Sequence, residues 1–132
     1  MKKLLVSIVN FRSLSSVKKL VEDIKKQKNI SARIIIVDNS MCHDEYNRLC
    51  EELDDRAITV IEAKKNLGYA KANNIALRLA QSDEYCLVVN PDIHFKNAMS
   101  ISELLRNIDE LGLDFVGPRF VDEMGVCAVS HL

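Results

Sequence analysis

The chain has 132 residues, which is the size of one domain that can bury a hydrophobic core without metal or disulfide support. Its 18 Lys and Arg residues nearly balance 19 Asp and Glu residues, and the formal net charge of -1 offers no general attraction to nucleic acid or to an anionic membrane. We therefore expect a single domain over residues 1–132 that recognises any phosphate locally.

The cysteines and the hydrophobic segments predict a cytoplasmic protein. The four cysteines have no C-x-x-C spacing, and two of them lie in apolar or helical patterns typical of reduced, packed thiols. The apolar run at residues 4–9 is short and breaks at Asn10, so it fits a first strand better than a signal peptide. No apolar segment approaches the roughly 20 residues of a transmembrane helix.

The first half of the chain predicts strands that alternate with helices. Residues 4–9 and 33–37 are apolar runs typical of buried parallel strands, and residues 58–61 predict a short strand. The first helix, for which Ser13 is placed as a cap, has apolar residues on one face. These are Leu14, Val17, Leu20, Val21 and Ile24. A polar helix follows the second strand and runs through Tyr46, Leu49 and Leu53.

The second half continues the alternation. Residues 66–70 open a helix whose repeating apolar positions are expected to pack inward: Tyr69, Ala72, Ala76, Leu79 and Ala80. A strand at 85–89 precedes a helix, which Asn97 is placed to cap and which carries Ile101, Leu104, Leu105, Ile108 and Leu111. The tail, residues 115–121 and 124–129, predicts a β-hairpin. This order predicts an α/β fold with a mostly parallel sheet and helices on both faces.

Polar residues follow three of the predicted strands. They are Asn10-Phe11, Asp38-Asn39-Ser40 and Asn90-Pro91-Asp92. Since parallel strands end at one edge, we expect Asp38 and Asp92 to flank a common crevice. There Asp92 can hold a divalent cation against a phosphate, and Asp38 can accept a hydrogen bond from a base or a ribose. Taken alone, Asp38 fits a helix cap or Asx turn equally well, and residues 90–92 fit a simple turn.

A second polar segment lies before the third predicted helix. Gly68 lets the backbone approach a ligand, and the helix that follows presents free N–H groups. Lys64 and Lys65 upstream fit a solvated pair better than a phosphate site. Asn73 lies in the first turns of that helix, where Asn is a poor helix former, and this hints at a polar contact.

Four segments in this order resemble the landmarks of family 2 glycosyltransferases with the GT-A fold, most of all their rhamnosyltransferase-like branch. They are Ser7-Ile8-Val9-Asn10-Phe11, Val37-Asp38-Asn39-Ser40, Asn66-Leu67-Gly68-Tyr69-Ala70-Lys71-Ala72-Asn73-Asn74 and Leu87-Val88-Val89-Asn90-Pro91-Asp92. Each is weak alone, but together they span most of the chain.

The resemblance implies a site for a nucleotide-diphosphate sugar, linked to UDP, dTDP or GDP. Its members are expected to be Asn10, Phe11, Asp38 and Asn39 near the nucleoside, with Asn66, Gly68 and Asn73 shaping the donor site. Asn90-Pro91-Asp92 stands where the family has D-x-D, so Asp92 would bind Mn²⁺ or Mg²⁺. Asn90 replaces the first acid and can accept a hydrogen bond, although it brings no charge.

The resemblance also implies inverting transfer of a hexosyl or deoxyhexosyl group to a glycan or lipid-linked acceptor in polysaccharide biosynthesis, in the cytoplasm or at its membrane face. Family members normally continue past position 132 into a part that binds the acceptor and supplies a general base. The chain is therefore expected to hold only the donor-binding part, and no catalytic residue is assigned.

Two alternatives remain. In the first, the chain is an inactive binding or assembly module, in which uncovered sheet surface favours a homo-oligomer. The other alternative is a different nucleotide-binding α/β protein. It lacks support, because neither G-x-x-x-x-G-K-[ST] nor G-x-G-x-x-G occurs in the sequence.

Overall fold

One parallel sheet organises the computed structural model, which describes residues 1–126. Within these residues the sheet has four strands: β1 (Lys2–Asn10), β2 (Ile30–Asp38), β3 (Ile58–Glu62) and β4 (Tyr85–Val88). Their order is β3-β2-β1-β4, and every pair is parallel. The carboxyl ends of all these strands therefore meet at one edge of the sheet, as the alternating pattern predicts.

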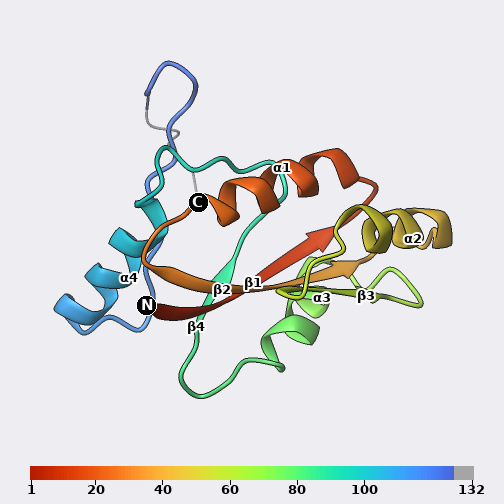
Figure 1. Cartoon of the computed structure of the whole chain (residues 1–132), viewed down its shortest axis with the longest axis horizontal. Coiled ribbons are helices and arrows are strands. Elements are labelled where there is room, and N and C mark those ends of the chain that lie inside the picture. The colour runs from red at the N-terminus through yellow and green to blue at the C-terminus, as the bar shows by residue number, and fades with distance from the viewer. Residues whose placement is uncertain (127–132) are drawn as a thin grey trace.

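Helices cover both faces of this sheet, which confirms the predicted α/β class (Figure 1). They are α1 (Leu14–Lys25), α2 (His43–Glu52), α3 (Tyr69–Leu77) and α4 (Ser100–Leu111). Residues of α1, α2 and α4 share one hydrophobic cluster with one face, whereas α3 packs against the other. No helix in residues 1–126 has the length and apolar character needed to cross a bilayer.

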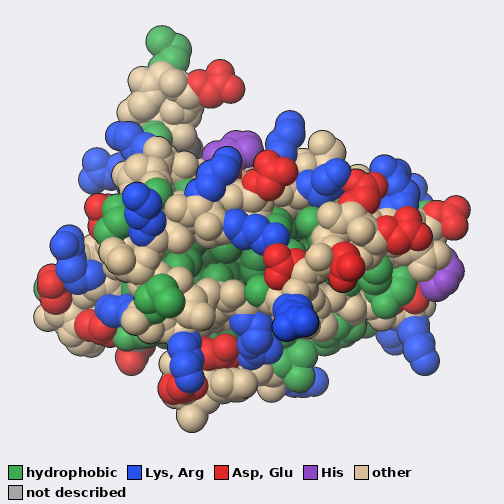
Figure 2. Space-filling view, in the orientation of Figure 1, with side chains coloured by type: hydrophobic (Ala, Val, Ile, Leu, Met, Phe, Trp, Pro, Cys, Tyr) green, Lys and Arg blue, Asp and Glu red, His purple; other side chains and the backbone are tan. Residues whose placement is uncertain are grey.

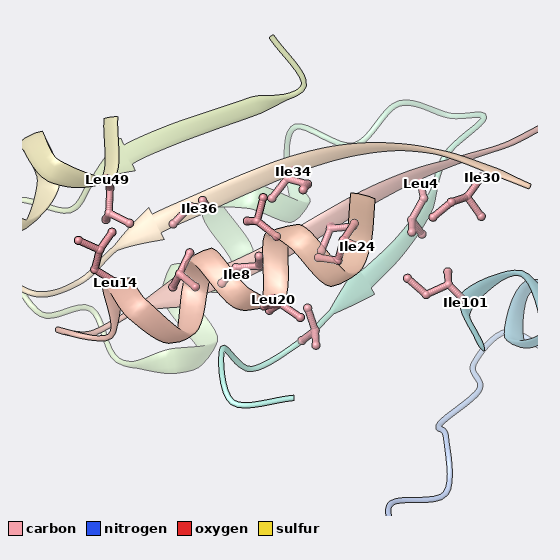
Figure 3. Packing of buried hydrophobic residues seen from close by; sticks show 14 of the residues in the cluster. Leu4, Ile8, Leu14, Leu20, Ile24, Ile30, Ile34, Ile36, Leu49 and Ile101 are labelled. Atoms are coloured by element: carbon pink, nitrogen blue, oxygen red, sulfur yellow. The ribbon is translucent and has the colours of Figure 1, made fainter. Parts of the chain in front are cut away.

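The core forms around the two central strands because both of their faces are covered. Alternate side chains of β2 point to opposite clusters: Ile36 packs with α1 and α2, and Ile35 packs with α3. Figure 3 shows Ile36 beside Leu14 and Leu49, and Leu4 facing Ile101 of α4. Burying each such side chain contributes about 1.5–3 kcal/mol, so the continuous apolar runs of β1 and β2 fit central strands.

Two predicted helix caps are wrong. The Ser13 hydroxyl makes no cap and instead donates to the Phe11 carbonyl oxygen at 2.9 Å. Glu45 of α2 takes its place, since its Oε1 accepts from the Leu14 N–H at 3.2 Å. Asn97 lies too early because α4 begins only at Ser100, and its Oδ1 accepts from the Met99 N–H at 2.7 Å in a local turn.

The inward packing predicted for α3 holds only in its middle. Ala72 and Ala76 are fully buried, but Tyr69 and Leu79 are about half exposed. The helix ends at Leu77, which leaves Leu79 outside it.

The predicted C-terminal hairpin is not formed over the described part of the tail. Residues 115–120 have no regular structure, and Val121 makes only an isolated bridge. A turn follows, in which the Gly125 N–H donates to the Asp122 carbonyl oxygen at 2.9 Å. The second predicted strand, 124–129, lies partly outside the described residues.

Candidate donor site

A cavity of about 520 Å³ lies at the carboxyl ends of the strands. Its walls come from the segments that follow β1, β2 and β4 and from the starts of α1 and α3. The lining residues are Val9, Phe11, Ser13, Ser16, Asn39, Asn66, Gly68, Tyr69, Asn90, Pro91 and Asp92. The structure thus brings together most of the polar residues that the sequence points to, although they are far apart in the chain.

A side-chain pair joins the end of β2 to the loop before α3. The Asn39 amide nitrogen donates to Asn66 Oδ1 at 2.8 Å, and Asn39 Oδ1 accepts from the Leu67 N–H at 2.8 Å. Asn66 Oδ1 also accepts from the Gly68 N–H at 2.9 Å. These bonds hold the backbone of Gly68 at the cavity, where its φ of 72° and ψ of 167° belong to a region that only glycine adopts readily.

The first turn of α3 opens into the same cavity. Gly68 and Tyr69 both line it, and an added Cβ on Gly68 would meet no atom within 4 Å. The N–H groups of a first helical turn have no partner within the helix and attract negative charge. The α3 start is therefore a suitable wall for an anionic ligand.

Asp38 lies in a buried network next to this cavity and is only 1% exposed. Its Oδ1 accepts hydrogen bonds from Asn10 Nδ2 at 2.9 Å, from the Ser40 hydroxyl at 2.6 Å and from the Ser40 N–H at 3.2 Å. Its Oδ2 is buried and has no hydrogen-bond partner among residues 1–126. A buried carboxylate oxygen without a donor is costly, and a bound water or a ligand group would complete it.

Asn10 holds this network together rather than facing the cavity. Its amide nitrogen also lies 3.2 Å from Ser40 Oγ and 3.2 Å from Glu45 Oε1, and its Oδ1 accepts from the Ser13 N–H at 3.0 Å. Every polar atom of the side chain is therefore used inside the protein. Asn10 and Asp38 are both absent from the cavity lining, so their predicted contact with a ligand remains a prediction.

The loops that follow β1 and β2 are strained and tied to each other. Arg12 has a φ of 51° and Met41 a φ of 53°, values that cost non-glycine residues about 1–3 kcal/mol each. The Arg12 N–H donates to Ser40 Oγ at 2.8 Å, which links the two loops. Strain of this kind is common where a fold presents side chains to a ligand.

Asp92 lines the cavity as an exposed carboxylate without a hydrogen bond or ion pair to any described residue. It stands alone, because residues 1–126 contain no group of three or more His, Cys, Asp or Glu side chains that could hold a metal ion. A single carboxylate still fits Mg²⁺ or a similar cation that takes its remaining ligands from phosphates and water. The residues present are thus compatible with a metal that binds together with a diphosphate.

Asn73 is buried between α3 and β1 and does not line the cavity. It is 4% exposed, its Oδ1 accepts from the Ser7 hydroxyl at 2.7 Å, and its amide donates to the Tyr69 carbonyl oxygen at 3.1 Å. This placement favours the packing of α3 on β1. Lys64 and Lys65 are exposed and do not line the cavity, as expected for a solvated pair.

The predicted site residues did not include five residues of the cavity lining, Val9, Ser13, Ser16, Tyr69 and Pro91, or one supporting residue, Glu45. Glu45 fixes Asn10 from α2. Tyr69 matches the helical spacing of a core residue, but it is 50% exposed because it stands in the first turn of α3. No sequence pattern near Glu45 distinguishes this residue from an ordinary solvent-exposed residue of a helix.

Solved structures with a similar fold are glycosyltransferases of the GT-A type. The mannosyltransferase PcManGT from Pyrobaculum calidifontis, in complex with GDP-Man and Mn²⁺, has a TM-score of 0.67 and 19% identity over 80% of this chain. TarS residues 1–349 from S. aureus, in complex with UDP-GlcNAc, has a TM-score of 0.67 and 24% identity over 83% of this chain. In both cases the chain spans only 32% of the longer protein.

Sequence comparison gives a family but no individual relative. No curated protein matches the chain. The model of the family described as glycosyl transferase family 2 matches residues 5–128, which includes every strand and helix described above except the first three residues of β1. The four sequence landmarks, the GT-A type sheet and this match agree, and the chain belongs to glycosyl transferase family 2.

Proposed function

We propose that residues 1–132 form one domain that binds a nucleotide-diphosphate sugar together with Mn²⁺ or Mg²⁺. The donor serves an inverting transfer of a hexosyl or deoxyhexosyl group to a glycan or lipid-linked acceptor, in polysaccharide biosynthesis. We infer a cytoplasmic location, at the membrane face for a lipid-linked acceptor. The family match and the polar cavity at the strand ends support this proposal.

One observation carries the proposal: Asp92, a carboxylate with no partner among residues 1–126, lines the same cavity as the first turn of α3. The helix end favours negative charge, and the carboxylate favours a cation. A metal-bound diphosphate brings a cation to Asp92 and negative charge to the first turn of α3, so it suits both parts of the cavity wall. A neutral ligand satisfies neither, and a free anion is repelled by Asp92.

The other cavity residues fit the remaining parts of such a donor. Phe11 is half exposed and offers a ring on which a base can stack. Asn90 can accept a ribose hydroxyl, and Asp38 can accept a base N–H. Asn39 and Asn66 act indirectly, because their hydrogen bonds hold the Gly68 backbone in place.

The departing nucleotide diphosphate carries developing negative charge, which the α3 start and the bound cation would stabilise. Asp92 would fix that cation against the diphosphate. The general base that takes the acceptor proton is assigned to none of the described residues. The domain therefore supplies donor binding and leaving-group stabilisation in this proposal.

Calorimetric titration of UDP, dTDP and GDP with and without Mn²⁺ tests the proposal. We expect metal-dependent binding of at least one of them, and we expect Asp92→Asn to remove the metal dependence. Asp54→Asn is the matched control, because Asp54 is an exposed carboxylate outside the cavity. A folded protein that binds none of the three nucleotides with metal would refute the donor site.

A second candidate function, an assembly module without catalysis, is favoured by uncovered apolar surface. β4 stands at the edge of the described sheet, where Val88 is 43% exposed. Phe115 and Met124 in the tail are about nine-tenths exposed. Such surface favours a homo-oligomer. Sedimentation that gives a monomer at all concentrations would exclude this function.

Charge does not oppose either function on the face seen in Figure 2, where Lys and Arg side chains alternate with Asp and Glu. No single-sign patch dominates this view. The charge pattern therefore agrees with local recognition of a ligand rather than with a broad electrostatic surface.

A further inference from the structure

Glu45 of α2 makes two hydrogen bonds to the segment that leads from β1 into α1. Its Oε1 accepts from the Leu14 N–H and from the Asn10 amide nitrogen, both at 3.2 Å. Leu14 is the first residue of α1, and Asn10 is the last residue of β1. One carboxylate oxygen of α2 therefore holds both ends of the connection between these two elements.

This connection forms part of the wall of the donor cavity, because Phe11 and Ser13 line it. Its backbone is strained, since Arg12 between them has a φ of 51°. Side chains hold it in place: the Ser13 N–H donates to Asn10 Oδ1 at 3.0 Å, and the Arg12 N–H donates to Ser40 Oγ at 2.8 Å. A strained segment keeps its conformation only while its surroundings fix it, so the shape of this wall depends on the orientation of these side chains.

The Asn10 side chain connects Glu45 to the strained segment. Asp38 Oδ1 is the nearest acceptor for its amide nitrogen, at 2.9 Å, and Ser40 Oγ and Glu45 Oε1 follow at 3.2 Å. Asp38 and Ser40 both belong to the end of β2 and the turn after it, whereas Glu45 approaches from α2. The amide group is planar, so the acceptors of its nitrogen also fix the direction of Oδ1, which receives the Ser13 N–H.

We propose that Glu45 is a positioning residue for the donor cavity: it orients Asn10, and through Asn10 it holds the segment that carries Phe11 and Ser13. The inference rests on the proposed donor site, and it adds a residue that does not itself line that cavity. Without the Glu45 oxygen the segment can relax into conformations that do not bind the donor. The apparent dissociation constant then rises in proportion to the loss of the competent conformation.

Glu45 can be replaced without opening a void in the core. Its side chain is half-buried and lines a second cavity of about 690 Å³ between α1 and α2, which shares Ser13 and Ser16 with the donor cavity. A shorter side chain there leaves space that water can fill. Glu45→Gln keeps an oxygen that can accept both hydrogen bonds, whereas Glu45→Ala removes it.

Calorimetric titration of UDP, dTDP and GDP with Mn²⁺ measures the effect on binding. For each nucleotide that the unaltered chain binds, Glu45→Ala should raise the dissociation constant about fivefold or more, and Glu45→Gln should keep it within about twofold. Glu51→Ala is the matched control and should leave it unchanged, because Glu51 is an exposed acid of α2 whose side chain makes no hydrogen bond to a described residue. An unchanged dissociation constant in Glu45→Ala would overturn the inference.

A double-mutant cycle with Phe11→Leu tests whether Glu45 acts through the cavity wall. If Glu45 positions the segment that carries Phe11, the loss of affinity caused by Phe11→Leu should be smaller in Glu45→Ala than in the unaltered chain. Equal losses in the two backgrounds would contradict the proposed route. A general loss of stability would not produce such coupling.

Amide hydrogen exchange tests the same link without a ligand. In Glu45→Ala the Arg12 and Ser13 N–H groups should exchange about fivefold or more faster, while the Ile36 N–H in the centre of β2 keeps its rate. Faster exchange at Leu14 alone would show that Glu45 only caps α1, and an equal rise at Ile36 would show a general loss of stability; either result would overturn the inference. Failure of every nucleotide to bind the unaltered chain would instead overturn the donor site, and with it this inference.

Discussion

Removal of the Asn39 side chain should loosen the loop before α3. Asn39 is 4% exposed and makes two hydrogen bonds, to Asn66 Oδ1 and from the Leu67 N–H, both at 2.8 Å. Asn39→Ala removes both and leaves the Leu67 N–H without that partner. Each such bond contributes about 0.5–1.5 kcal/mol, so the free energy of unfolding should fall by about 1–3 kcal/mol.

A double-mutant cycle isolates the contact between the two side chains. Asn66→Ala removes the acceptor for the Asn39 amide and for the Gly68 N–H. The effects of Asn39→Ala and Asn66→Ala should therefore not add, and the coupling should be about 0.5 kcal/mol or more. Urea unfolding followed by circular dichroism measures all the variants.

Asn74→Ala is the matched control. Asn74 is exposed on α3, and its side chain makes no hydrogen bond to a described residue. Its replacement should change the free energy of unfolding by less than about 0.5 kcal/mol. Strictly additive effects of the changes at positions 39 and 66 would refute the proposed link between the end of β2 and the Gly68 loop.

Three further predictions concern pH, packing and backbone geometry. A hydrogen bond from Arg33 is the main cause that lowers the pKa of Glu84 below its ordinary value of 4.5. The ion pair therefore stabilises the fold above pH 4.5, and this stabilisation is lost as the pH falls through the lowered pKa of Glu84. Glu84→Gln should flatten this part of the acid unfolding curve, and an unchanged curve would contradict the prediction. Ile36→Ala should lower the free energy of unfolding by about 2–5 kcal/mol in urea, because Ile36 is fully buried; a loss below 1 kcal/mol would argue against a packed centre. Gly68→Ala should lower the free energy of unfolding by about 1–3 kcal/mol, because Gly68 has a positive φ. Gly117 also faces open space but has no positive φ, so Gly117→Ala should leave the free energy of unfolding unchanged. Equal losses in the two variants would disprove the conformational argument.

Much of the fold can be predicted from the sequence because its strongest patterns are those of parallel strands covered on both faces. The apolar runs of β1 and β2 have no polar face, and only central strands bury both sides. The apolar positions of α1 repeat at helical spacing, and all five are buried in the structure. The tail offers no such constraint, since residues 115–120 are mostly exposed and form no strand.

The identity of the polar residues after the strands was determined by the sequence alone, as was their common edge, because parallel strands must end together. Only the tertiary structure decided what each one does. It turned Asn10 inward to hold Asp38, and it left Tyr69 at the cavity. It also placed three donors on one oxygen of Asp38 and none on the other. Such differences depend on side chains that meet from distant parts of the chain, and residue spacing carries no record of those contacts.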